Sequence, residues 1–372
     1  MHKVQLTYQL SRRPGPQGSP DHGPGLHHPL MAMLAAVHST GSISGAARQL
    51  GLSYRHVWGE LKRWELELGQ ALVSWVKGQP ALLSPFGDKL LWAERRAQAR
   101  LAPQIEALRS ELERALAIAF DDSAGVITMY ASHDDALPRL RDLAQTRHGL
   151  LLDVQFTGSV DALAALNDGR CLLAGFHALV DSPRQSPTAR TYRPMLQPGK
   201  HKLIGFARRM QGLIVAPGNP LGLHQLADLT RPGLRFCNRA RGTGTRVVLE
   251  QLLDTQQLSL DDIPGEAQSE PSHLAAAEAV ASGRADVAFG IEAAAEARQL
   301  GFVPLAEEQY FLVTLASSLD HPHLQTLLTL LASPDWRREL YRIPGYGPQQ
   351  CGEVLSLRKV LPWWSYRTPR HP

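Results

Sequence analysis

Between residues 30 and 68 the hydrophobic positions repeat with helical spacing, and each run stops at residues that typically end helices. Gly41 ends the first run, Ser42 and Ser44 offer N-caps for the second, and Ser53 is a natural N-cap for the third. Two short helices joined by a turn that contains glycine predict a helix-turn-helix. The predicted helices run from Leu30 to Gly41, from Gly45 to Leu50 and from Tyr54 to Leu68.

Two short apolar segments follow, Ala71–Trp75 and Ala81–Leu83, and we expect them to form a hairpin, or wing, with its loop at Lys77–Pro80. From Ser84 a long helix is predicted whose apolar positions step by three and four residues, which is typical of a dimerising coiled-coil seam. Pro103 lies inside it and should kink or split the helix, because an interior proline costs ~3 kcal/mol. The seam consists of Ala97, Leu101, Ile105, Leu108, Leu112, Ala115 and Ala119.

Beyond Asp121 short apolar segments alternate with helical ones, a pattern that predicts an α/β sheet. Two stretches resemble each other locally: Leu166–Arg170 before a strand ending at Gly175, and Val280–Arg284 before a strand ending at Gly290. We therefore expect two similar lobes. The first set of predicted elements is 126–131, 138–146, 150–156, 159–167 and 171–175, and the second is 213–215, 223–229, 234–237, 245–255, 274–282 and 287–291.

Composition excludes several classes of protein. The 372 residues are 44% hydrophobic with a net charge of only +4, which excludes a chain that is disordered throughout. No apolar run approaches the roughly 20 residues that span a bilayer, so we expect no membrane partner. The three cysteines are isolated, which excludes a disulfide scaffold, and we predict no metal site and no cofactor beyond a small effector. Without a secretory signal, we expect a cytoplasmic location.

The positive charge is concentrated at the front. Residues 1–120 carry 14 Lys and Arg against 9 Asp and Glu, whereas the remainder is almost neutral. With the helix-turn-helix this favours double-stranded operator DNA as a partner, read by the third helix in the major groove and by phosphate contacts. The predicted DNA-binding residues are Ser42, Ser44, Ser53, Tyr54, Arg55, Trp58, Lys62, Arg63 and Lys77.

These residues carry a resemblance. The run Gly41–Ser44, Ala46-Ala47, Gly51–Tyr54, Trp58 and the exit Leu83–Gly87 resembles the winged helix-turn-helix of ModE-type molybdate-responsive regulators and, more loosely, that of LysR-type regulators. The resemblance implies a homodimer on a pseudo-palindromic operator. It also suggests control of genes for molybdenum or tungsten enzymes, such as formate dehydrogenase.

A glycine-rich loop between a predicted strand and a predicted helix indicates an anion site. Free N–H groups at the start of the helix, two threonine hydroxyls and the charges of Arg239, Arg241 and Arg246 suit a carboxylate, oxyanion or phosphate. Loops at other strand ends should converge on it. The predicted effector-binding residues are Ser132, His133, Gly158, Ser159, His177, Arg241, Gly242, Thr243, Gly244, Thr245 and Arg246.

The second half resembles the type 2 periplasmic-binding-protein-like domain of regulators and of molybdate/tungstate receptors. The resemblance rests on Gly158-Ser159, Gly169-Arg170, Ala174-Gly175-Phe176-His177, Val215–Pro220, Arg239–Arg246, Ser282–Gly290 and Pro344–Tyr346. It implies a ligand cleft between two lobes joined by two crossovers, near 206–216 and 309–315. ModE-type regulators normally carry a small barrel domain instead, so their oxyanion cannot be transferred to this chain.

The predicted fold is α/β overall: a winged helix-turn-helix, a linker helix and a bilobed effector domain. We interpret the chain as a one-component transcription regulator that senses a small anionic effector, such as an oxyanion or a molybdenum-cofactor-related ligand, and not as an enzyme. The alternatives are a carrier protein without DNA binding, which would not need the basic face at 53–63, and an enzyme built on the two lobes. The domains are 1–29 (flexible tail), 30–87, 88–121 and 122–372, with lobe 1 at about 122–208 and 316–372 and lobe 2 at about 209–315.

Overall fold

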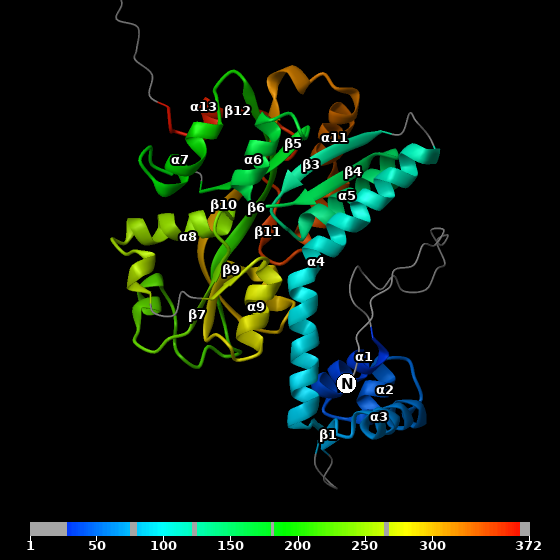
Figure 1. Cartoon of the computed structure of the whole chain (residues 1–372). Coiled ribbons are helices and arrows are strands. Elements are labelled where there is room, and N and C mark those ends of the chain that lie inside the picture. Colours follow the sequence, from blue (N-terminus) through cyan, green and yellow to red (C-terminus); the bar gives the residue numbers. More distant parts are fainter. Residues whose placement is uncertain (1–27, 75–79, 121–124, 180–181, 264–267, 365–372) are drawn as a thin grey trace, which may run out of the picture. The chain divides into compact units, whose positions relative to one another are not determined.

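The computed structural model describes residues 28–74, 80–120, 125–179, 182–263 and 268–364 (Figure 1). The chain divides into two compact units, Met1–Ile105 and Glu106–Pro372, here called the N-terminal and the C-terminal unit. One long helix belongs partly to each of them. The two units are described separately.

The N-terminal unit is a helix-turn-helix followed by a short hairpin. Gly41 ends the first helix in the left-handed conformation (φ 63°), and Ser42 and Ser53 cap the next two helices through hydrogen bonds of 2.9 and 3.1 Å to their hydroxyls. The third helix has the predicted bounds, whereas the second begins two residues earlier because Ser42, not Ser44, is its N-cap. The elements are α1 (Pro29–Thr40), α2 (Ile43–Gln49), α3 (Tyr54–Leu68), β1 (Val73–Ser74), β2 (Leu82–Leu83) and α4 (Pro85–Phe120).

The predicted strands of the wing are present as the antiparallel pair β1 and β2, and residues 75–79 of its loop lie outside the described residues. The core of this unit consists of the apolar faces of the three helices, and the small residues Ala46 and Ala47 are fully buried where α2 packs. Such small side chains let helices approach each other closely.

Helix α4 is continuous through Pro103, so the predicted split does not occur. Its second half is fastened within the C-terminal unit. The buried hydroxyl of Ser110 accepts a 3.0 Å hydrogen bond from Val154 N, and buried Glu106 forms an ion pair with buried Arg141. Several leucines on the same half remain exposed.

The C-terminal unit is built on one ten-stranded sheet. Along its main path the order is β4-β3-β5-β10-β6-β9-β7-β8, and β11 and β12 pair with β6. Parallel pairs at both ends flank the long antiparallel pair of β6 and β10. The strands are β3 (Val126–Ala131), β4 (Leu151–Phe156), β5 (Leu173–Ala178), β6 (His201–Val215), β7 (Phe236–Arg239), β8 (Gln268–Glu270), β9 (Val287–Ile291), β10 (Gly301–Leu315), β11 (Tyr346–Gly347) and β12 (Val354–Ser356).

Strands β6 and β10 are the predicted crossovers, and each is longer than the sequence indicated. They run through both strand groups, so nearly every β6 side chain is buried and no polar alternation marks the strand. We call β3, β4 and β5 with their helices lobe 1, and β7, β8 and β9 with theirs lobe 2. This bilobed sheet confirms the predicted fold class.

Helices cover the sheet in both lobes. Helix α5 begins two residues before the predicted start at Pro138. The N–H groups of the first turn have no partner within the helix, so a proline is tolerated there and does not mark the first residue. The helices are α5 (Ala136–His148), α6 (Ser159–Asn167), α7 (Pro187–Tyr192), α8 (Gly244–Thr255), α9 (His273–Ala281), α10 (Glu292–Glu296), α11 (Pro322–Ala332), α12 (Pro334–Tyr341) and α13 (Leu357–Val360).

No single helix among the described residues is long and apolar enough to cross a membrane. Helices α1 and α2 reach the required length and apolarity only as a pair, across a bend of 118°.

Candidate functional site

The N-terminal part of α3 presents an exposed polar and aromatic surface. Ser53, Tyr54 and Arg55 are exposed, and Tyr54 stacks on Trp58 with ring centroids 6.4 Å apart and planes 6° apart. Lys62 lies 4.8 Å from the centre of the Trp58 ring. Local capping by Ser53 and burial of the opposite side of α3 therefore bring these five predicted DNA-binding residues onto one face.

The basic residues of this face differ in how they are paired. Lys62 and Arg63 each form an ion pair within the helix, at 2.6 Å to Glu65 and 2.5 Å to Glu60. Arg55 has no ion pair within the described part of the chain and is therefore available to an external anion.

The remaining predicted DNA-binding residues are distributed over the unit. Ser42 is committed to its capping bond, Ser44 is exposed on α2, and Lys77 lies outside the described residues. Sequence reasoning did not select Arg48, which is also exposed on α2, close in sequence to Ser44.

In the C-terminal unit, loops from the two lobes meet at the ends of the strands. The hydroxyls of Ser132 and Ser159 lie 3.3 Å apart. A Cβ atom on Gly158 would lie 2.7 Å from the carbonyl oxygen of Gly242, and one on Gly244 would lie 3.0 Å from His177. The predicted effector-binding residues of the two lobes thus touch, and only glycines fit at this contact.

The loop before α8 has the predicted location but uses its side chains differently. The Thr243 hydroxyl donates to Ala240 O at 2.8 Å, and the Thr245 hydroxyl lies 3.2 Å from Nε2 of His273. Arg246 donates to Glu250 at 3.1 Å, and Arg241 is exposed. Neither of these arginines is a free cation inside the cleft.

Arg239, the last residue of β7, is the buried cation of the cleft. Its side chain is 1% exposed, Nη2 donates to Pro271 O at 3.0 Å, and Nε and Nη1 have no hydrogen-bond partner within the described residues. Burial, together with neighbouring Arg209, lowers the pKa of Arg239 to about 9, so the side chain is still a cation at neutral pH. Two unused donors on a buried cation favour an anionic ligand.

Three histidines surround this cation, and all three are neutral at pH 7. Burial holds the pKa values of His177 and His273 well below their ordinary range and lowers that of His133 to about 4. The Arg239 charge acts in the same direction on each. Both ring nitrogens of His177 and Nδ1 of His273 lack hydrogen-bond partners among the described residues.

A buried ionic network lies where β6 and β10 pass between the lobes. Arg209 of β6 pairs with Glu308, its cross-strand partner on β10, and with Asp134 from the end of β3. Asp134 also accepts a 2.7 Å hydrogen bond from the Tyr346 hydroxyl, and Gln211 donates to Glu308 at 2.7 Å. Because these carboxylates surround one guanidinium, the pKa of Arg209 is raised well above its usual value.

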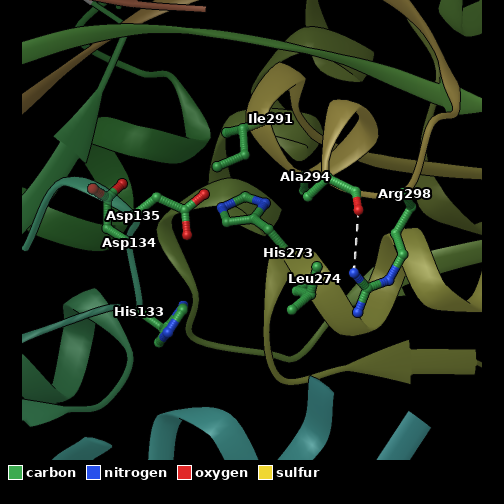
Figure 2. Close-up of a pocket in the computed structure, with 9 residues that line it drawn as sticks. His133, Asp134, Asp135, His273, Leu274, Ile291, Ala294 and Arg298 are labelled. Carbon is green, nitrogen blue, oxygen red and sulfur yellow. Dashed lines mark hydrogen bonds between the residues drawn. The ribbon is translucent and has the colours of Figure 1, made fainter. Parts of the chain in front are cut away.

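A pocket of about 250 Å³ opens beside this network (Figure 2). Asp135 lies at the mouth of this pocket and is exposed. Desolvation by the surrounding residues and the negative charge of Asp134 raise the pKa of Asp135 to about 6. Arg298 is held by a 2.6 Å bond to Glu278. The lining consists of His133, Asp134, Asp135, His273, Leu274, Ile291, Ala294, Ala297 and Arg298. No cluster of three or more metal-ligating side chains occurs within the described ranges.

Sequence reasoning named Arg239 among the charges of the anion loop but left it out of the predicted site, and it missed His273, Arg209 and Glu308. Arg239 and His273 each had a local signal, because one ends a strand and the other starts a helix after the N-cap Ser272. Arg209 and Glu308 had none, because their pairing depends on the register of two strands about a hundred residues apart.

Comparisons with known proteins are consistent with this architecture. Residues 140–332, just over half of the chain, match the PBP superfamily domain. Residues 29–88 match the bacterial regulatory helix-turn-helix protein of the lysR family.

Individual relatives match parts of the chain. It is 31% identical over 201 residues to the uncharacterized protein YvgK of Bacillus subtilis, a match that covers 54% of this chain and 64% of YvgK, less than two thirds of that relative. It is 35% identical over 86 residues to the molybdenum-pterin-binding protein MopB of Rhodobacter capsulatus, covering 22% of this chain and 32% of MopB. The crystal structure of full-length BenM superposes with a TM-score of 0.43 at 15% identity, over 84% of this chain and 96% of that one.

The ionic network predicts a specific pattern of stability. Arg209→Met leaves the Asp134 and Glu308 carboxylates buried without their cation, and we expect the free energy of unfolding to fall by about 3–5 kcal/mol in calorimetry. The triple variant Asp134→Asn/Arg209→Met/Glu308→Gln should recover most of the loss, and equal instability of the two variants would contradict the role of the network.

Proposed function

Because the chain belongs to the PBP superfamily and its residues 29–88 to the lysR family of bacterial regulatory helix-turn-helix proteins, we propose that it is a DNA-binding transcription regulator controlled by a small effector. The observation that carries the proposal is the exposed Arg55 at the start of α3, which has no ion pair among the residues that the structure describes and lies on a face that also presents Ser53, Tyr54 and Lys62. The N-terminal end of such a helix contacts base edges in the major groove. The regulator acts in the cytoplasm and is assigned no catalytic reaction.

Arg55→Ala should weaken specific operator binding by about 1–3 kcal/mol if the side chain contacts a base, and binding by the wild type should fall steeply with salt. The measurement is fluorescence anisotropy on a site selected from genomic fragments. Arg96→Ala, which removes an exposed arginine from α4, is the matched control and should bind as the wild type does. Equal losses in both variants would indicate a general charge effect, and the failure to select any site would refute DNA recognition.

The regulator is a homodimer formed through the second half of α4. Leu108, Leu112 and Leu116 are 53, 39 and 36% exposed on that half, and they recur at the four-residue spacing of one helix face. A second copy of α4 would bury this face, as coiled-coil seams do. A dimer also matches the two-fold symmetry of a pseudo-palindromic operator.

Leu108→Glu places a charge in that apolar interface and should shift the dimer to monomers in sedimentation velocity at micromolar concentration. Leu108→Met preserves the apolar volume and should remain dimeric. A Leu108→Glu variant that sediments as an unchanged dimer would place the interface elsewhere.

The effector is a small anion held by Arg239 and by the loop Gly242–Thr245. The support for this is the buried guanidinium with two unused donors, next to backbone N–H groups at the start of α8. The similarity to MopB supports a link to molybdenum or tungsten, either as an oxyanion or as a molybdenum-cofactor-related ligand, and target genes for enzymes such as formate dehydrogenase. A ligand that contacts both lobes favours the closed state over the open one, and this differential affinity couples binding to regulation.

Arg239→Met should weaken binding of the effector about ten- to hundredfold, because a charge-assisted contact contributes about 1.5–3 kcal/mol. Molybdate, tungstate, phosphate and any ligand found by native mass spectrometry of the purified protein are tested by calorimetry. Arg241→Met changes an exposed arginine of the same loop and should bind almost normally. If Arg241→Met is the weaker binder, the anion lies on the outer side of the loop; if no anion binds the wild type, the proposal fails.

A further inference from the structure

The pocket beside the ionic network adjoins the proposed anion site. His273 forms part of both, because its Nε2 atom lies 3.2 Å from the Thr245 hydroxyl of the anion loop while the residue also lines the pocket. Its Nδ1 atom is without a hydrogen-bond partner among the described residues, although only 4% of the residue is exposed. A buried, unsatisfied polar group in the wall of a cavity is a point at which a polar ligand group can form a hydrogen bond.

Of the charged residues that line the pocket, only Asp135 has no ion pair within the described residues, and its charge is negative. Asp134 forms an ion pair with Arg209, and Arg298 forms one with Glu278. Asp135 has no hydrogen bond or ion pair within the described ranges, and its carboxylate points toward His273 in Figure 2. His133 and His273 are neutral, so neither of them compensates the charge of Asp135.

A fully deprotonated tetrahedral oxyanion presents acceptors only, so it offers the Asp135 carboxylate no hydrogen bond and brings a second negative charge close to it. A carboxylate instead accepts hydrogen bonds from N–H groups, and two parallel N–H groups form the strongest such contact. We propose that the effector carries two groups in one molecule: an anionic group bound by Arg239 and an N–H donor group bound by Asp135. This inference rests on the effector site proposed above. Asp135 therefore determines specificity, and it selects against a bare oxyanion.

The pocket limits the size of this donor group. A volume of about 250 Å³ equals roughly eight water molecules. One aromatic ring system or one short aliphatic chain fits. The N–H donors can therefore come from the amidine-type edge of a 2-amino-4-oxo heterocycle or from the ammonium group of an amino acid.

Calorimetry of the full chain with matched probes distinguishes these sources. Pterin-6-carboxylate carries the amidine-type edge and an anion, lumazine-6-carboxylate lacks the exocyclic amino group, L-glutamate carries an ammonium group, and molybdate is the bare oxyanion. We expect either pterin-6-carboxylate or L-glutamate to bind more tightly than molybdate. If the heterocycle is correct, lumazine-6-carboxylate binds at least tenfold more weakly than its amino counterpart.

Asp135→Asn is the decisive variant. The Asp135 side chain makes no capping hydrogen bond to α5, so the variant should fold normally. It should bind the N–H-bearing probe at least tenfold more weakly, and molybdate as weakly as before or slightly better. Asp320→Asn, at an exposed carboxylate outside the pocket, should change neither affinity.

Three results would overturn the inference: unchanged affinity of Asp135→Asn for the N–H-bearing probe, preference of the wild type for molybdate over both N–H-bearing probes, or no binding of either of these two probes. Binding of molybdate that Arg239→Met abolishes and Asp135→Asn leaves unchanged would refute the donor requirement while supporting the proposed anion site. If neither Arg239→Met nor Asp135→Asn weakens binding, both the donor requirement and the proposed anion site are refuted.

Discussion

The C-terminal unit depends on one buried cation, the guanidinium of Arg209. It lies on β6 at the point where the chain passes from one lobe to the other, and it pairs with Glu308 on the adjacent β10 and with Asp134 at the end of β3. Two crossing strands and a loop of lobe 1 are therefore fixed by the same charge. Burying an ionic group is costly unless its partners are all present, so this arrangement specifies one register of β6 against β10. That register in turn places the ends of the remaining strands around the cleft.

The N-terminal unit could be predicted almost residue by residue, because its signals are local. Gly41, Ser42 and Ser53 act on their own helices through a left-handed turn and two capping bonds, and each of these appears in the structure. The alternation of strands and helices beyond residue 121 was equally visible, since buried parallel strands form short apolar runs. The long crossing strands were recognised only in part: in β6, burial in both lobes removes the polar positions that would mark its length, whereas in β10 only the second half is buried and only that half was predicted.

The cleft could be located from the sequence, but its chemistry could not. The glycine-rich loop before α8 and the serines at the ends of the lobe 1 strands were found because glycine and serine at strand ends are local features. Which arginine faces inward is a tertiary property: Arg239 is buried, while Arg241, two residues later, is exposed. The same holds for Asp135, whose lack of a partner depends on Arg209 having been taken by Asp134 and Glu308.

The position of α4 constrains how an effector signal can leave the cleft. Ser110 binds the backbone of β4 and Glu106 binds Arg141 of α5, so the second half of α4 is fixed to lobe 1 and moves with it. Lobe 2 contacts lobe 1 at the glycine pair Gly158 and Gly242, through α8, whose Val247 packs in the lobe 1 core and whose Gln251 donates to Ser182 at 2.9 Å, and through the two crossing strands. In the regulator proposed above, an effector that draws lobe 2 toward lobe 1 would move lobe 2 relative to the second half of α4, with the two crossing strands as the hinge. In the homodimer proposed above, the signal would pass through what lobe 2 contacts, and the effector would change the arrangement of the two copies rather than bend α4.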